Sequence, residues 1–150
     1  MPAWEDPEHW RAICDPAGCP ICTDGPRDVL LELDASWVTA PVQAALPGYA
    51  CVISKQHVVE PWELPDRGAS FWADAMQVAE ALKTHVAAVK MNYEIHGNTI
   101  PHLHLHLYPR YPGDPHTGRP TGATEVHATR SPGQLAAMRA AIERRARGAA

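Results

Sequence analysis

The stretch TIPHLHLHLYPRY (residues 99–111) places three histidines at alternate positions, with a leucine after each one. Side chains on a β-strand point alternately to its two faces, so His102, His104 and His106 share one face and the leucines share the other. A row of leucines is typical of a face that packs on a core. The stretch therefore predicts a strand that contributes to the core on one side and turns three imidazoles toward a cleft on the other.

The flanking sequence predicts four more short strands and two helices. The strands are expected at residues 28–33, 36–40, 49–54 and 91–95, and the histidine strand at 102–109, where prolines end regular structure. Apolar residues recur every three or four positions from 68 to 90, which predicts one long amphipathic helix. A C-terminal helix is expected at about 132–147, capped by Ser131. This order of elements predicts an α+β fold with a five-stranded antiparallel sheet.

Length and charge restrict the class of protein. A chain of 150 residues is expected to form a single domain (1–150). The net charge of −4 argues against broad capture of nucleic acid, because proteins that bind the phosphate backbone usually carry a basic face. No apolar run approaches the roughly 20 residues of a spanning helix, and the N-terminus does not resemble a secretory signal. The sequence therefore predicts a cytoplasmic protein that binds neither membrane nor nucleic acid.

Residues 1–27 hold five prolines and three of the four cysteines. This composition predicts an irregular segment that something other than a core must hold in place. Cys19 and Cys22 have the spacing of a metal-binding pair, and a pair of metal-free thiols is the alternative. Cys14 is expected to be a bystander, and Cys51, within an apolar strand, a core residue.

The run from His102 to Tyr108 resembles the motif of the histidine-triad (HIT) family, His-φ-His-φ-His-φ-φ, where φ is apolar. The Pro109-Arg110 that follows is also typical of the family. The resemblance covers roughly residues 15–112 and extends upstream through Asn92, Gly97 and Asn98. Asn98 stands where the family usually has glutamine. The zinc-containing branch of the family is the most similar, since it carries the same cysteine pair.

The resemblance implies a nucleotide hydrolase or nucleotidyltransferase that acts on the α-phosphate of nucleoside phosphoramidates, dinucleoside polyphosphates or sugar nucleotides. It implies that His104 is the nucleophile, forming a covalent nucleotidyl-histidine, and that His106 holds the phosphate or the departing group. Attack requires a neutral imidazole whose other nitrogen donates a hydrogen bond, expected to go to the backbone carbonyl of His102. Activity is then expected to decline as pH falls through about 6 to 7. Substrate contacts are implied for Asn92, Asn98 and Thr99.

The resemblance also implies a structural zinc ion, and the segment 14–27 would be the zinc-binding segment. Its four ligands would be Cys19, Cys22, His57 and His102. A closed site of four protein ligands leaves no position for substrate, so the ion would hold the N-terminal segment against the histidine strand. Magnesium could accompany polyphosphate substrates, and a homodimer is implied by the family.

Several alternatives stay open at the level of sequence. The three imidazoles could chelate a metal, or simply face solvent on a histidine-rich strand. His57 could contact the catalytic histidines without a metal. The chain could be a non-catalytic metal-binding or nucleotide-binding module on the same scaffold, or a transferase or phosphorylase whose acceptor is not water.

Overall fold

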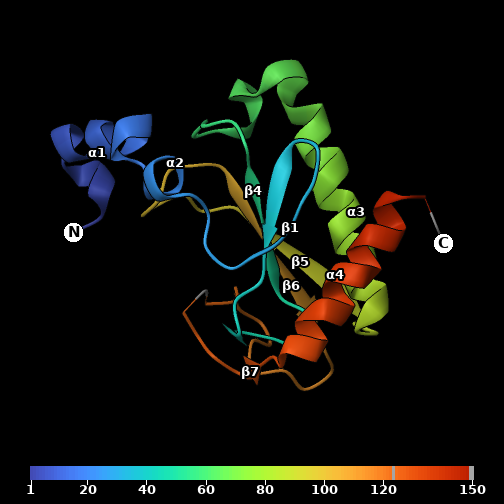
Figure 1. Cartoon of the computed structure of the whole chain (residues 1–150). Helices are drawn as coiled ribbons and strands as arrows, with labels where there is room; N and C mark the ends of the chain where they lie inside the picture. The colour runs from blue at the N-terminus through green and yellow to red at the C-terminus, as the bar shows by residue number, and fades with distance from the viewer. Residues whose placement is uncertain (123, 149–150) are drawn as a thin grey trace.

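A computed structural model describes residues 1–122 and 124–148 (Figure 1). Its centre is a five-stranded antiparallel sheet in the order β1-β2-β4-β6-β5. These strands are β1 Val29–Glu32, β2 Ser36–Thr39, β4 Ala50–Ser54, β5 Lys90–Glu94 and β6 His104–Arg110. Figure 1 shows α3 (Ala69–His85) and α4 (Pro132–Ala146) on one side of the sheet and α1 (Pro7–Cys14) and α2 (Pro20–Asp24) on the other. The predicted α+β class and five-stranded antiparallel sheet are confirmed.

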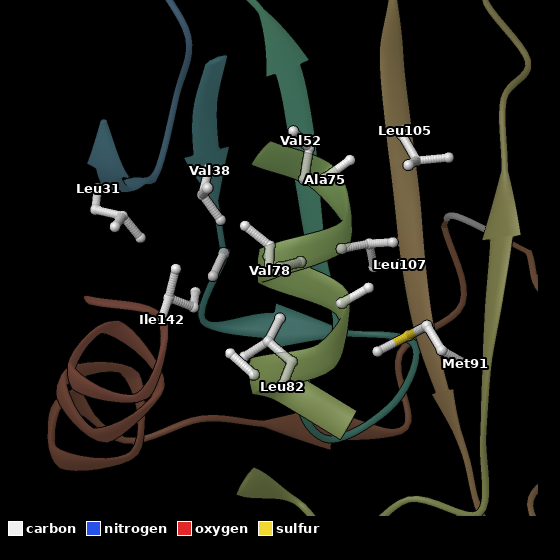
Figure 2. Close-up of a cluster of buried hydrophobic side chains, with 14 of the residues drawn as sticks. Leu31, Val38, Val52, Ala75, Val78, Leu82, Met91, Leu105, Leu107 and Ile142 are labelled. Carbon is white, nitrogen blue, oxygen red and sulfur yellow. The ribbon is translucent and has the colours of Figure 1, made fainter. Parts of the chain in front are cut away.

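The leucine face of β6 lies in the main core. Leu103, Leu105 and Leu107 are at most 2% exposed and belong to one apolar cluster with residues of α3 and α4. In Figure 2, α3, which carries Val78 and Leu82, lies next to β6, which carries both Leu105 and Leu107; all four side chains belong to the same apolar cluster. Removal of this apolar area from water stabilises the fold and fixes which face of β6 points inward. The histidines must then emerge on the opposite face.

Several element boundaries differ from the sequence-based expectation, most of them by one residue. The long helix ends at His85 rather than at residue 90, because Ala87 has a left-handed backbone (φ 53°) and Val89 N–H already bonds to Arg110 of β6. Strand β6 ends at Arg110, one residue beyond the predicted end, and includes Pro109, which pairs with Met91 of β5. It begins at His104 rather than at residue 102, although Leu103 still bonds to Ser54 and Val58 through its backbone.

The expectation of an irregular N-terminal segment is wrong. Helix α1 begins at Pro7 because Asp6 caps it, accepting hydrogen bonds from the N–H groups of Glu8 and His9. Short 3-10 helices are also present at Ala3–Glu5, Pro16–Gly18, Pro61–Glu63 and Pro65–Gly68.

A small second sheet was not predicted. In it, β3 (Gln43–Ala44) pairs with β7 (Ala128–Thr129) and holds the chain between β6 and α4. Two-residue strands carry too little periodicity to be read from a sequence. Across both described ranges, no helix is long and apolar enough to cross a lipid bilayer.

Candidate active site and metal centre

His104 occupies the face of β6 that is turned away from the core. It pairs with Ile53 of β4, and its side chain is half-buried. Its Nδ1 lies 2.6 Å from the backbone oxygen of His102, as the sequence predicted. A carbonyl oxygen can only accept, so Nδ1 carries the proton and Nε2 holds a free lone pair. This is the tautomer that a nucleophilic imidazole requires.

His106 is held in the opposite tautomer by Tyr49, a residue that sequence reasoning missed. The Tyr49 hydroxyl lies 2.8 Å from His106 Nδ1. Burial raises the pKa of Tyr49 well above its ordinary value, so the phenol stays protonated. Within the described part of the chain, this nitrogen is the one acceptor available to the hydroxyl. His106 Nδ1 therefore accepts, and its Nε2 carries a proton that it can donate.

Burial keeps both imidazoles neutral. It lowers the pKa of His104 below that of a free histidine. Burial, assisted by His104 and His96, lowers the pKa of His106 to about 4. The two ring centroids are 5.0 Å apart in an edge-on arrangement. The site thus places a free lone pair and a fixed N–H donor side by side, both uncharged at neutral pH.

A cavity of about 420 Å³ opens beside His104. Its walls include the apolar side chains of Ile21, Ile53 and Ile100, and Asp24 and Arg27 of the N-terminal segment also line it. An apolar cavity with a few polar groups is the usual form of a small-molecule site. Its volume lies in the range of about 300 to 1,000 Å³ that is usual for such sites.

A second cavity, of about 690 Å³, lies along β5 and contains Asn92. His96 lines it together with Arg119, and the His96 ring centroid is 6.0 Å from that of His106. His96 Nε2 also donates a hydrogen bond of 3.0 Å to Glu94 Oε2. A site role for His96 was not predicted, because the residue follows the end of β5, where the alternation of strand side chains no longer applies.

Asn98 and Thr99 lie elsewhere. Both are exposed, and they line a cavity of about 370 Å³ together with the N-terminal residues Pro2 and Trp4. Neither residue lines the cavity of His104 or that of Asn92. The structure thus brings Asn92, His104 and His106 to the same face of the sheet and places Asn98 and Thr99 against the N-terminal segment.

The four residues predicted as metal ligands form one cluster. Cys19, Cys22, His57 and His102 each offer a ligand atom within 4.8 Å of the others. Cys19 Sγ is 3.5 Å and Cys22 Sγ 3.6 Å from His102 Nδ1. Cys22 Sγ is 3.2 Å from His57 Nδ1. A tetrahedral zinc ion with these donors would separate them by about 3.3 to 3.8 Å, so the cluster has the dimensions of such a site.

The two imidazoles of the cluster need a cation between them. His57 Nε2 lies 2.7 Å from the Cys14 carbonyl, and His102 Nε2 lies 2.7 Å from the Ser54 carbonyl. Both Nε2 atoms must donate, so both Nδ1 atoms present lone pairs, and these face each other at 3.2 Å. Two lone pairs repel unless a proton or a metal lies between them. Carbonyl partners on the outer nitrogens are also the usual support of zinc-binding histidines. The donor set therefore fits a closed metal site.

Comparisons with known proteins agree with this geometry. A curated relative, the bifunctional bis(5'-adenosyl)-triphosphatase/adenylylsulfatase FHIT of Arabidopsis thaliana, is 28% identical over 95 residues, which are 59% of this chain and 53% of the relative. The chain thus spans about half the length of that relative.

Solved structures share the fold. A histidine triad protein from Bradyrhizobium japonicum aligns with a TM-score of 0.67 and 25% identity over 78% of this chain and 88% of its own. A Zn-bound histidine triad family protein from Mycobacterium smegmatis aligns with a TM-score of 0.62 and 22% identity over 87% and 96%. The model of the HIT domain matches residues 23–113. The chain belongs to the HIT domain family.

Proposed function

We propose that this protein is a nucleotide hydrolase or nucleotidyltransferase that cleaves at the α-phosphate of a nucleoside phosphoramidate or a dinucleoside polyphosphate. The observation that carries the proposal is the pair of complementary tautomers, with a free Nε2 on His104 and an N–H donor on His106. The activity in the name of the Arabidopsis relative, a bis(5'-adenosyl)-triphosphatase, supports the same substrate class.

The reaction proceeds in two displacements. In the first, the Nε2 lone pair of His104 attacks the α-phosphorus, and the bond from phosphorus to the leaving group breaks. The His106 N–H donates to the phosphoryl oxygen or to the departing atom and so stabilises the charge that develops there. In the second, water or another acceptor attacks the nucleotidyl-histidine, releases the nucleotide and restores His104. The nature of this acceptor decides between a hydrolase and a transferase.

The two cavities are proposed to bind different parts of the substrate. We assign the nucleoside to the cavity of about 420 Å³ beside His104, where isoleucines can cover a base. The leaving group then extends toward the cavity of about 690 Å³ beside Asn92 and Arg119. Asn92 is proposed to contact the substrate there. Asn98 and Thr99 are proposed contacts only for a substrate long enough to reach the N-terminal segment. Magnesium with polyphosphate substrates, a homodimer and a cytoplasmic location stay predictions.

Cys19, Cys22, His57 and His102 are proposed to hold a structural zinc ion. A bound zinc ion would crosslink these four side chains and would take no part in the displacement. Because His102 is a ligand through its ring and an acceptor through its carbonyl, its position also orients His104. The cluster thus joins the first histidine of the triad to α2 and leaves the second free for chemistry.

The covalent intermediate provides the direct test. The protein is mixed with a panel of adenylated and guanylated phosphoramidates and dinucleoside polyphosphates, quenched in base to preserve the phosphorus–nitrogen bond, and analysed by mass spectrometry. A nucleotide adduct on His104 is expected. An adduct that forms but persists in water identifies a transferase with another acceptor. If no substrate gives an adduct, the chain is a binding module.

Tyr49→Phe tests the tautomer assignment. Loss of the hydroxyl frees His106 to place its proton on either nitrogen, so kcat/KM is expected to fall about 5-fold to 10-fold, the usual effect of one hydrogen bond. The matched control is Tyr108→Phe. Tyr108 also stacks on His106, but its buried hydroxyl has no hydrogen-bond partner among the described residues. Equal losses in the two variants would refute a role for the hydroxyl bond.

The pH dependence of kcat/KM is expected to differ from the titration of a free histidine. Since burial lowers the pKa values of His104 and His106, both stay neutral below the pH of 6 to 7 at which an ordinary imidazole protonates. The acid limb of kcat/KM is therefore expected to have its midpoint below 6.5, the ordinary pKa of an imidazole. An acid limb with a midpoint of 6.5 or higher would contradict the assignment. Histidines with lowered pKa values bind protons more tightly when unfolded, so acid also destabilises the fold and circular dichroism must accompany each rate.

A further inference from the structure

The segment that follows β6 carries a second group of metal-ligand side chains. His116, Glu125 and His127 each offer a ligand atom within 4.8 Å of the others. This group lies outside residues 23–113, the part of the chain that the HIT domain model matches. It shares no residue with the cysteine-containing cluster or with the histidine pair of the candidate active site.

His116 is the unusual member of the group. Its side chain is 0% exposed, and neither ring nitrogen has a hydrogen-bond partner within residues 1–122 and 124–148. A buried polar group without a partner is rare in a folded protein and calls for an explanation, such as a bound ion. Glu125 Oε2 lies 3.6 Å from His116 Nδ1, too far for a hydrogen bond.

The distances suit a small divalent ion. Glu125 Oε2 is 3.6 Å from His116 Nδ1 and 3.3 Å from His127 Nε2. Nitrogen and oxygen ligands of a tetrahedral zinc ion lie about 3.4 Å apart. An ion equidistant from the three atoms would give His116 the partner that it lacks. Two histidines and one carboxylate with an open fourth position are a ligand set that transition metals of the zinc type accept.

The three side chains are fixed by different parts of the fold. The His116 N–H bonds to Asp114, which also accepts two hydrogen bonds from Arg110 of β6. His127 directly precedes β7, and its N–H bonds to Ala44 of the second sheet. The group is therefore assembled by backbone anchors at both ends of the segment, which reduces the ordering that an ion would have to impose.

Arg119 holds the carboxylate of Glu125 in place and leaves it able to bind an ion. Its guanidinium bonds to both oxygens of Glu125, at 2.8 and 3.1 Å. A carboxylate has about four lone-pair sites, so two remain for other partners. The side chains of Glu125 and His127 are 33% and 42% exposed, which gives an ion a path from solvent.

We propose that His116, Glu125 and His127 form a second binding site, for a divalent transition-metal ion such as zinc. The site would hold the segment that supplies Gly118, Arg119 and Pro120 to the wall of the cavity beside Asn92 and His96. The Thr121 N–H bonds to Glu94 of β5, so the same segment already contacts the strand at that cavity. A metal ion there would order one wall of the proposed substrate site without touching the chemistry at His104.

The test is metal stoichiometry of the full-length, tag-free chain. After loading with zinc chloride and gel filtration, mass spectrometry of the metal is expected to give two zinc ions per chain. His127→Ala and Glu125→Gln, both at accessible positions, are expected to give one. His85→Ala, which removes an exposed histidine of α3, is the matched control and is expected to keep two. A wild-type chain that binds one ion, or a His127→Ala chain that still binds two, overturns the proposal.

Cobalt substitution identifies which site loses its ion. Only the cysteine-containing cluster can give an absorption band from sulfur to cobalt. His127→Ala is expected to keep that band at full intensity while it loses one equivalent of cobalt. Loss of the sulfur band in His127→Ala would mean that the variant disturbs the cysteine cluster, and it would overturn the assignment. This readout does not depend on whether the protein is an enzyme.

Discussion

His104→Asn is expected to lower kcat/KM by about 10⁴-fold or more, the loss that follows when a covalent nucleophile is removed. The asparagine side chain can still donate a hydrogen bond toward the His102 carbonyl, so the local backbone has a reason to stay in place. Its amide nitrogen has no free lone pair, however, and cannot bond to phosphorus. Initial rates with a nucleoside phosphoramidate, measured to a detection limit well below the wild-type rate, give the result.

The matched control for this variant is His85→Asn, the same substitution at an exposed position of α3. It is expected to keep wild-type activity. Thermal unfolding of both variants shows whether the fold is intact, and His104→Asn is expected to unfold within a few degrees of wild type because the residue contributes little to the main core. Wild-type activity in folded His104→Asn would remove this residue from the mechanism.

The fold was predictable where periodicity was strong. Three leucines alternating with three histidines leave one choice of inward face, and that choice is the one observed in β6. Element ends were harder to predict, because they depend on partners that are distant in sequence. The apolar Val89 extended the predicted helix, yet its N–H bonds to Arg110, and the residue is 63% exposed. The spacing of apolar residues does not show whether a residue such as Val89 continues a helix or pairs with a strand.

In the candidate site, too, local contacts were predictable and contacts between residues distant in sequence were not. The hydrogen bond from His104 to the His102 carbonyl spans two residues and follows from strand geometry. The bond from Tyr49 to His106 spans 57 residues, and a tyrosine at the start of a strand gives no local signal. A site at His116, Glu125 and His127 was not predicted for the same reason. Only the chain path after β6 brings them together.

Cys22→Ser is expected to abolish binding of the ion at the cysteine-containing cluster and to destabilise the fold by about 3 kcal/mol or more. A serine hydroxyl is a poor ligand for zinc, and binding free energy at a structural site is largely folding free energy. Without the ion, the facing lone pairs of His57 and His102 must separate or take up a proton. Either movement displaces the His102 carbonyl, so kcat/KM is also expected to fall. Urea unfolding and zinc content measure the two effects.

Cys14→Ser is the matched control, because it makes the same change eight residues away on the same side of the sheet. Cys14 contacts the cluster through its carbonyl, which accepts from His57 Nε2, and serine keeps that carbonyl. Zinc content, urea midpoint and activity are expected to stay close to wild type. Removal of the ion from the wild-type chain with the chelator dipicolinate should reproduce the loss of stability in Cys22→Ser. Addition of zinc should restore the urea midpoint of the wild-type chain but not that of the variant. If the wild-type chain held no ion at this cluster and Cys22→Ser kept the wild-type urea midpoint, the cluster would be a set of metal-free thiols and imidazoles, and the orientation of His104 would have to come from β4 and β6 alone.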